Sequence, residues 1–230
     1  TEGKLIQAHG GSVMFWKGGS PTEDKFLQFS DAVCVWGGKT SVEAIKKKVS
    51  ASVEFIEFGP KRSLSLIGRE ANSDRERVAR GIAHDISVYN QEACFCPQNV
   101  YIESDKPMVF AEVLSKALAE YTTILPKGHV SIDNHSHVSL SRLMAQMRGN
   151  HLIYPDNTDW TIIISDDKEP VSEHPLSRTI YLHAVNDLTE VLPYINGDVQ
   201  TIGIWPWNRS KELCEAFTLA GACRFSPVGD

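Results

Sequence analysis

Short apolar or β-branched runs alternate with helical windows along almost the whole chain, and this alternation constrains the fold more than any other feature. The runs typical of strands cover residues 12–16, 32–36, 53–58, 64–67, 99–102, 160–164, 178–183 and 201–205. The helical windows cover residues 41–49, 73–89, 109–122, 139–149, 188–195 and 210–220. Strands separated by helices usually pair in parallel. The sequence therefore predicts an α/β fold with a mostly parallel sheet and flanking helices.

Punctuation between these segments predicts where elements begin and where the chain divides. Ser73 followed by Glu76 has the spacing of a capping box and predicts the start of the longest helix. Residues 126–137 and 166–175 are polar or rich in charge and proline, and they are predicted to be loops. A change of composition at Gly59-Pro60 is the predicted seam between two domains.

Charge and cysteine content exclude several classes of protein. The chain has 23 Lys and Arg against 29 Asp and Glu, and its longest basic run is Lys46-Lys47-Lys48, so a nucleic-acid-binding face is not predicted. Its apolar runs are too short to span a membrane. Five cysteines, an odd number, favour reduced thiols and a cytoplasmic protein over a secreted disulfide scaffold. Because the sequence starts at a Thr and stops at Asp230, we expect it to be a piece of a longer protein.

Two features near the predicted seam are candidates for chemistry. Gly37 and Gly38 follow a predicted strand and open a predicted helix, a place where backbone N–H groups can approach a phosphate, although a plain tight connection has the same pattern. Glu57, at the end of the next predicted strand, could act as a general base if burial raised its pKa. An ion pair with Lys61 or Arg62 is the simpler interpretation of that carboxylate.

Cys94 and Cys96 lie on a predicted bend between a helix and a strand, which is where reactive side chains are often placed. One residue separates Cys94 from Cys96, whereas a short metal-binding clip usually has two or more intervening residues, so a shared metal ion is poorly served. His135 and His137 alternate in a polar loop, and we expect them to be solvated rather than zinc ligands. A Cys–His hydrolase or acyltransferase would need one of His84, His129, His135 or His183 to reach Cys94, and the sequence has no local signature for such a pair. Cys34, Cys214 and Cys223 are predicted to be ordinary buried thiols.

Several short motifs together give the chain a family resemblance. They are Val35-Trp36-Gly37-Gly38, Phe58-Gly59-Pro60-Lys61-Arg62-Ser63, Gly81-Ile82-Ala83-His84-Asp85, Gln91-Glu92-Ala93-Cys94, Ile124-Leu125-Pro126-Lys127-Gly128, Pro175-Leu176-Ser177-Arg178, Asn186-Asp187 and Pro206-Trp207. With these motifs the chain resembles the acyl-CoA reductases of bacterial luminescence, the LuxC family, a branch of the aldehyde dehydrogenase superfamily. The resemblance spans nearly the whole chain and implies an aldehyde-dehydrogenase-like fold.

The resemblance also implies roles for particular residues. Cys94 would carry a fatty acyl group as a thioester, and NADPH would reduce that group to a long-chain aldehyde. Gly37 and Gly38 would approach the cofactor pyrophosphate, Glu173 would contact the nicotinamide ribose, and Glu57 would match the general base of the hydrolytic dehydrogenases. Cys96 has no implied role, and no metal is implied.

At the level of the whole chain, the resemblance implies that residues 1–60 are the remainder of an NADP-binding domain. Residues 61–230 would form a catalytic domain that is incomplete at its C-terminal end. The implied partners are a fatty acyl-CoA or acyl-protein substrate, an acyl-protein synthetase and, for the full-length protein, further copies of itself. Two other functions stay open at this point: an aldehyde dehydrogenase acting on a short aldehyde, and a non-catalytic fragment or partner-binding domain.

Overall fold

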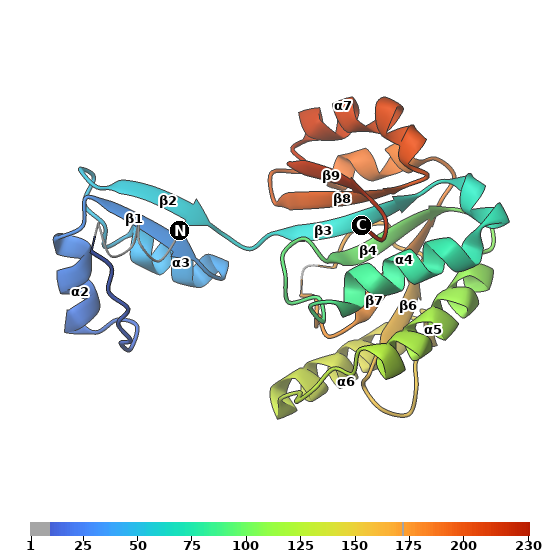
Figure 1. Cartoon of the computed structure of the whole chain (residues 1–230), viewed down its shortest axis with the longest axis horizontal. Helices are drawn as coiled ribbons and strands as arrows, with labels where there is room; N and C mark the ends of the chain where they lie inside the picture. Colours follow the sequence, from blue (N-terminus) through green and yellow to red (C-terminus); the bar gives the residue numbers. More distant parts are fainter. Residues whose placement is uncertain (1–9, 172) are drawn as a thin grey trace. The chain divides into compact units, whose positions relative to one another are not determined.

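The structure is a computed structural model that describes residues 10–171 and 173–230. It divides into two compact units, with the boundary between Pro60 and Lys61 (Figure 1). Each unit is described by itself.

The first unit is a βαβ motif preceded by a short helix. Its elements are α2 (Pro21–Gln28), β1 (Ala32–Trp36), α3 (Lys39–Lys46) and β2 (Glu54–Phe58). The two strands pair in parallel along their whole length, from Ala32 opposite Glu54 to Trp36 opposite Phe58. Only Glu23, Leu27 and Val42 are buried among the described residues of this unit. It is therefore a thin layer with little core.

Helix α2 was not predicted from the sequence, and a predicted strand is missing. Pro21 occupies the first turn of α2 and the Ser20 side chain accepts a hydrogen bond from the Glu23 amide, which are standard signals for a helix start. Residues 12–16, predicted to be a strand, have no regular structure, and Val13 and Phe15 are fully exposed. A strand needs a partner for its backbone groups, and none of the described strands pairs with this segment.

The second unit is built on a seven-stranded sheet. Its strands lie in the order β5 (His151–Ile153), β6 (Thr161–Ser165), β7 (Thr179–Val185), β4 (Pro97–Glu103), β3 (Arg62–Ile67), β8 (Val199–Trp205) and β9 (Arg224–Pro227). Every neighbouring pair is parallel except β5 with β6. The predicted α/β fold with a mostly parallel sheet is confirmed. The two edge strands, β5 and β9, were missed because each is short and lacks a continuous apolar run.

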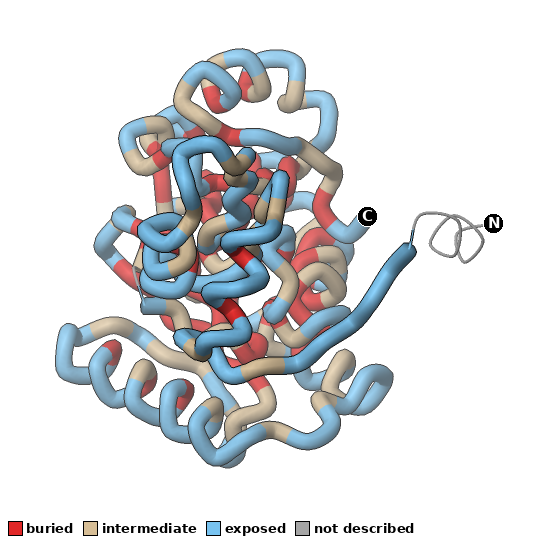
Figure 2. The backbone as a smooth tube through the Cα atoms, turned by 90° about the vertical axis from the view of Figure 1, so that its left-hand side faces the viewer, coloured by how far each residue is buried: buried red, intermediate tan, exposed pale blue. Residues whose placement is uncertain are grey.

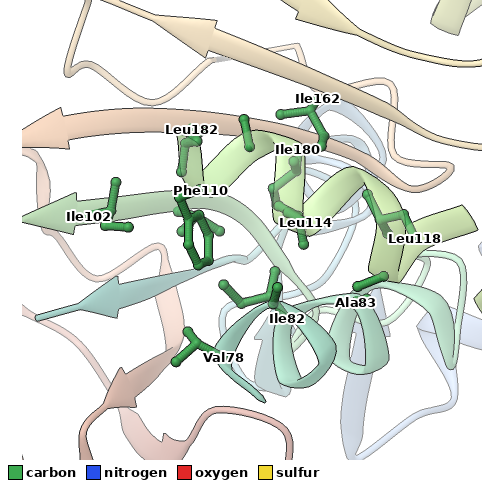
Figure 3. Packing of buried hydrophobic residues seen from close by; sticks show 14 of the residues in the cluster. Val78, Ile82, Ala83, Ile102, Phe110, Leu114, Leu118, Ile162, Ile180 and Leu182 are labelled. Atoms are coloured by element: carbon green, nitrogen blue, oxygen red, sulfur yellow. The ribbon is translucent and has the colours of Figure 1, made fainter. Parts of the chain in front are cut away.

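Helices cover both faces of this sheet. On one face α4 (Arg75–Ser87) and α5 (Pro107–Ile124) pack against strand residues such as Ile102, Ile162 and Leu182 (Figure 3). On the other face lie α7 (Ser210–Ala220) and the 3-10 helix η2 (Leu188–Tyr194), while α6 (Ile132–Met147) packs Ala145 against Ile163. Buried positions gather on the strands and on the inner side of the helices (Figure 2). Such two-sided cover explains the near-continuous apolar runs of the strands.

Two local predictions for this unit are wrong. The predicted capping box is not formed, because Ser73 ends the 3-10 helix η1 (Arg69–Ser73) and its hydroxyl donates to the Glu70 carbonyl. Asp74 is the N-cap of α4 and makes no side-chain capping bond. The second half of the predicted loop 126–137 belongs to α6, whose N-cap Ser131 accepts a hydrogen bond from the Asn134 amide. A serine followed by helix-compatible residues was the signal that could have revealed this start.

Candidate active site

Cys94 lies on the turn that connects the end of α4 to the start of β4. We call residues 88–96 of this turn the thiol loop. The Cys94 side chain is exposed, whereas Cys96 is buried. Burial raises the pKa of the Cys96 thiol, which disfavours the nucleophilic thiolate form there. The structure thus confirms the predicted bend and distinguishes the two sulfurs by exposure.

The thiol loop is hydrogen-bonded to the N-terminal ends of strands in the middle of the sheet. The Ser63 hydroxyl on β3 donates to the Cys94 carbonyl at 2.7 Å and accepts from the Thr201 amide on β8 at 3.1 Å. The buried Gln91 amide nitrogen donates to the carbonyls of Pro97 and Thr179, at 2.8 and 2.7 Å, which tie the loop to β4 and β7. The loop that carries Cys94 is therefore hydrogen-bonded to β3, β4 and β7, and β8 holds the Ser63 hydroxyl in turn.

A cavity of about 280 Å³ borders the thiol loop. Its apolar wall includes Val88, Tyr89 and Phe95 from the loop, with the Tyr89 and Phe95 rings packed edge to face at 5.3 Å between centroids. Its polar lining includes the buried hydroxyls of Ser65 and Thr201, which have no hydrogen-bond partner among the described residues. Space for a ligand with both apolar and polar groups therefore lies beside the loop.

Asp85, at the C-terminal part of α4, contributes a titratable group to the same cavity. Burial raises the pKa of its carboxyl to about 7, opposed by the hydrogen bond that its Oδ2 accepts from the Gly229 amide at 3.0 Å. A carboxyl with this pKa is partly protonated near neutral pH and can both give and take a proton.

The histidines that were open as partners of Cys94 are engaged elsewhere or exposed. His183 is buried between the Asp167 carbonyl and Asn99 Oδ1, and burial lowers its pKa to about 4. The His84 ring contacts the Tyr121 hydroxyl at 3.3 Å, and His135 contacts Thr158 Oγ1 at 2.5 Å. Within residues 10–171 and 173–230, none of the histidines hydrogen-bonds the Cys94 sulfur. His135 and His137 lie on α6 rather than in a loop.

Metal ligands do not gather in the part of the chain that the structure describes: groups of three or more His, Cys, Asp or Glu with suitable geometry are absent there. Other thiols differ from the prediction. Cys34 and Cys223 are exposed and Cys214 is half-buried. Cys34 follows the strand pattern, but its face of the β1–β2 pair has no cover among the described residues of its unit, so the apolar run did not imply burial.

The predicted glycine turn belongs to the first unit. Gly37 follows β1, and Gly38 is the N-cap of α3 without a side-chain capping bond. A Cβ atom added at Gly38 would meet nothing within 4 Å, so open space lies beside the turn. The first turn of α3 contains Lys39 and no acidic residue. Free N–H groups, the helix dipole and a lysine together suit a phosphate group.

The two candidate carboxylates are both exposed. Glu57 on β2 pairs with Lys46 at 3.1 Å, and the side chains of both are about half exposed. Lys61 and Arg62, the partners expected from the sequence, instead donate to the carbonyls of Gly197 and Tyr194. Glu173 lines a separate cavity of about 720 Å³ together with the acidic loop residues 166, 167 and 169. Cys94 and Glu173 thus belong to the second unit, while Gly37, Gly38 and Glu57 belong to the first.

Sequence reasoning missed the residues that hold the thiol loop. Ser63, Gln91, Lys127 and Arg178 all stand in the short motifs, but no role was predicted for them. Their membership of short motifs on four separate segments was the available signal.

The chain is similar in sequence to one family of known proteins along most of its length. The family described as "Acyl-CoA reductase (LuxC)" matches residues 7–230. The long-chain acyl-protein thioester reductase of Vibrio harveyi is 36% identical over 223 residues, which are 95% of this chain and 46% of the relative. The reductase of Aliivibrio fischeri is 34% identical over 221 residues, with 95% and 46% covered. The chain thus spans about half the length of the curated relatives it matches.

Solved structures with the same fold are aldehyde dehydrogenases. An NAD-dependent benzaldehyde dehydrogenase from Corynebacterium glutamicum superposes with a TM-score of 0.75 at 11% identity, covering 99% of this chain and 55% of that chain. An NADP-dependent glyceraldehyde-3-phosphate dehydrogenase from Bacillus halodurans gives 0.71 at 16% identity, with 96% and 51% covered. The predicted aldehyde-dehydrogenase-like fold is confirmed. None of the helices within the described residues has the length and apolar character needed to cross a bilayer.

Proposed function

The chain belongs to the acyl-CoA reductase (LuxC) family, and from this premise we propose that Cys94 carries a long-chain acyl group as a thioester while that group is reduced to an aldehyde. The observation that carries the proposal is the contrast between two sulfurs of one loop. Cys94 is exposed on a turn that is hydrogen-bonded to three strands, and Cys96 is buried with a raised pKa. A nucleophile has to be both accessible and held in place.

The chemistry has two steps. First, the Cys94 thiolate attacks the carbonyl carbon of an acyl thioester, so that a new carbon–sulfur bond forms and the donor leaves as a thiolate. Second, a hydride adds to the carbonyl carbon of the acyl-Cys94 thioester, and the carbon–sulfur bond breaks to release the aldehyde and restore the Cys94 thiolate. The acyl carbon is reduced by two electrons and the hydride donor is oxidised by two.

We propose NADPH as the hydride donor. When it is bound, it would supply the two electrons in the form of a hydride. Gly37 and Gly38 would hold its pyrophosphate, because the turn leaves open space beside Gly38 and the first turn of α3 has free N–H groups. Glu173 would contact the nicotinamide ribose. Residues 1–60 would accordingly be the remainder of the NADP-binding domain, and residues 61–230 the thiol-bearing catalytic domain.

Glu57 is proposed as a general base for hydrolysis of the thioester, not for its reduction. Reduction consumes no water, so it needs no group that deprotonates water. The Glu57 carboxylate forms an exposed pair with Lys46 at 3.1 Å. If the protein instead oxidised short aldehydes, Glu57 would be needed in every turnover, and Glu57→Gln would abolish the reaction.

For the complete protein we propose fatty acyl-CoA or a fatty acyl-protein as substrate, an acyl-protein synthetase as a source of the acyl group, and assembly into homo-oligomers in the cytoplasm. The names of the Vibrio harveyi and Aliivibrio fischeri relatives support an acyl-protein donor.

The experiment is incubation of the protein with a long-chain acyl-CoA, followed by mass spectrometry of the intact protein and its peptides. We expect one added acyl mass, located on Cys94, which disappears in Cys94→Ser and persists in the control variant Cys96→Ala. Hydroxylamine should release the group, as it does from thioesters. A folded protein without an adduct, or an adduct located on Cys96, would overturn the proposal.

A further inference from the structure

The Arg178 side chain, at the start of β7, is 1% exposed and contacts the thiol loop from inside the protein. Its Nε donates to Asn90 Oδ1 at 2.7 Å. Its Nη2 donates to the Leu125 carbonyl at 2.7 Å and to the Ser87 carbonyl at 3.4 Å. One guanidinium therefore joins the thiol loop to two other segments.

Both of these carbonyls lie at the ends of helices. Ser87 is the last residue of α4, and Leu125 is the C-cap of α5. The C-terminal end of a helix carries partial negative charge and unpaired carbonyl groups, so a cation is favourable there. Among the described residues, none of the carboxylates forms an ion pair with Arg178. The ends of two helices therefore face this buried charge, and the Asp159 carboxylate adds a longer-range attraction.

Lys127 supports the segment that bears Arg178. Its Nζ donates to the Ser177 carbonyl and hydroxyl, both at 2.8 Å, and to the Thr158 carbonyl at 2.6 Å. This bonding is needed because Leu176, Ser177 and Arg178 all have φ of 55°, a left-handed conformation that is costly for residues other than glycine. Lys127 and the 176–178 turn therefore form one rigid support.

Asn90 is where this support meets the thiol loop. Besides its bond to Arg178, its carbonyl accepts from the Ser177 amide at 3.0 Å, and its side-chain nitrogen donates to the Lys127 carbonyl at 3.4 Å. Asn90 and Gln91 have φ of 50° and 64°. These left-handed residues turn the chain out of α4, and four residues later it reaches Cys94. Asparagine tolerates this conformation, but bonding is needed to select it.

We propose that Arg178 is a positioning residue for Cys94. By bonding Asn90 and the ends of α4 and α5, it sets the direction in which the thiol loop leaves α4 and thereby the place where the thiol is presented. The proposal rests on the proposed function for its catalytic meaning, since it concerns the nucleophile of that reaction. Lys127 acts through Arg178 by holding the 176–178 turn.

The test compares Arg178→Met with Leu213→Ala, a core variant in α7 on the other face of the sheet, chosen as a control for lost stability. Two quantities are measured well below both melting temperatures: the rate of Cys94 acylation by a long-chain acyl-CoA, and hydrogen exchange of the amides of residues 91–96. We expect Arg178→Met to slow acylation about tenfold and to speed exchange about tenfold, the size of one lost hydrogen bond to a charged group. Leu213→Ala should change neither.

Further variants keep the test decisive. Arg178→Lys retains the positive charge at the helix ends but not the several N–H donors of the guanidinium group. We therefore expect its acylation rate to lie between those of Arg178→Met and the unaltered protein. If Arg178→Met does not fold, Asn90→Gly removes the same side-chain bond while easing the left-handed backbone, and a slower acylation rate is again expected.

Acylation and exchange that change equally in Arg178→Met and Leu213→Ala would overturn the positioning role. If the unaltered protein is not acylated, the proposed function fails, but the exchange measurement still decides whether Arg178 holds the thiol loop.

Discussion

The two units are made from the same elements, parallel strands joined by helices, and yet they differ sharply in burial. In the first unit, Trp36 at the end of β1 is 70% exposed and stacks on Phe58. In the second, Ile67 at the end of β3 is completely buried between β4 and β8. A parallel strand is stable and dry when it has neighbours on both edges and cover on both faces. The number of neighbours, not the strand sequence, makes this difference.

The same contrast applies to charge. Lys46 and Glu57 in the first unit form an exposed pair, whereas Glu103 in the second unit is 4% exposed. Glu103 accepts hydrogen bonds from Arg209 at 2.7 Å and from the amides of Arg69 and Leu188. Cys94 therefore lies on the unit with the larger buried core, and the turn at Gly37 and Gly38 lies on the unit with few buried residues.

The largest loss of stability is expected from a substitution at Gly221, just after α7. Its φ is +121°, and an added Cβ would lie 2.6 Å from the Asn196 carbonyl carbon. Gly221→Ala should therefore lower the free energy of unfolding of the second unit by about 3 kcal/mol or more. Urea denaturation followed by circular dichroism measures it. A loss below about 1 kcal/mol would show that the second unit accommodates an added side-chain atom despite its burial, which would contradict the contrast with the first unit.

An intermediate effect is expected at Glu103. Glu103→Gln leaves Arg209 without its buried partner and should cost about 2–4 kcal/mol at pH 7. The matched control is Glu57→Gln, which removes an exposed pair and should cost less than about 1 kcal/mol. An equal loss of unfolding free energy in Glu103→Gln and Glu57→Gln would contradict the proposed difference between the two units.

The Glu103 effect should also depend on pH. Burial acts against the carboxylate, but Arg209 and the amides of Arg69 and Leu188 outweigh it and hold the pKa of Glu103 below the ordinary value of about 4.5. A lowered pKa means that the stabilisation is complete above the unfolded-state value and is lost as the pH falls through the folded-state value. The difference between wild type and Glu103→Gln should therefore shrink below about pH 4, as measured by thermal unfolding across pH 3–7.

The smallest effect on stability is expected at Gly38 of the first unit. Its φ of −63° is open to any residue and an added Cβ has free space, so Gly38→Ala should change the free energy of unfolding by less than about 0.5 kcal/mol. NADPH binding should weaken severalfold, because the methyl group would occupy the space proposed for the pyrophosphate. Calorimetric titration measures this. Unchanged NADPH affinity in Gly38→Ala would remove the turn from the cofactor proposal.

Much of the fold could be predicted because strand and helix periods are local properties. Seven of the predicted strands match β1, β2, β3, β4, β6, β7 and β8, and the parallel arrangement follows from the helices between them. The failures include residues 12–16, where a strand-like run has no regular structure, and the capping of α4, where a preceding 3-10 turn takes the serine. Helix α2, the edge strands β5 and β9 and the start of α6 were also missed. Pairing and capping depend on neighbours that a local pattern does not contain.

For the site, residue patterns were enough to predict a thiol on a bend between a helix and a strand and a glycine turn at the start of a helix. The exposure of Cys94, the burial of Cys96 and the exposure of Cys34 despite its strand pattern became known from the folded chain. Folding also brought Arg178 to Asn90 across 88 positions of sequence and Ser63 to Cys94 across 31. The two kinds of feature differ in how far apart the interacting residues are in the sequence. Turns and helix starts are encoded by adjacent residues, whereas burial and the support of a loop come from segments that meet only when the sheet is assembled.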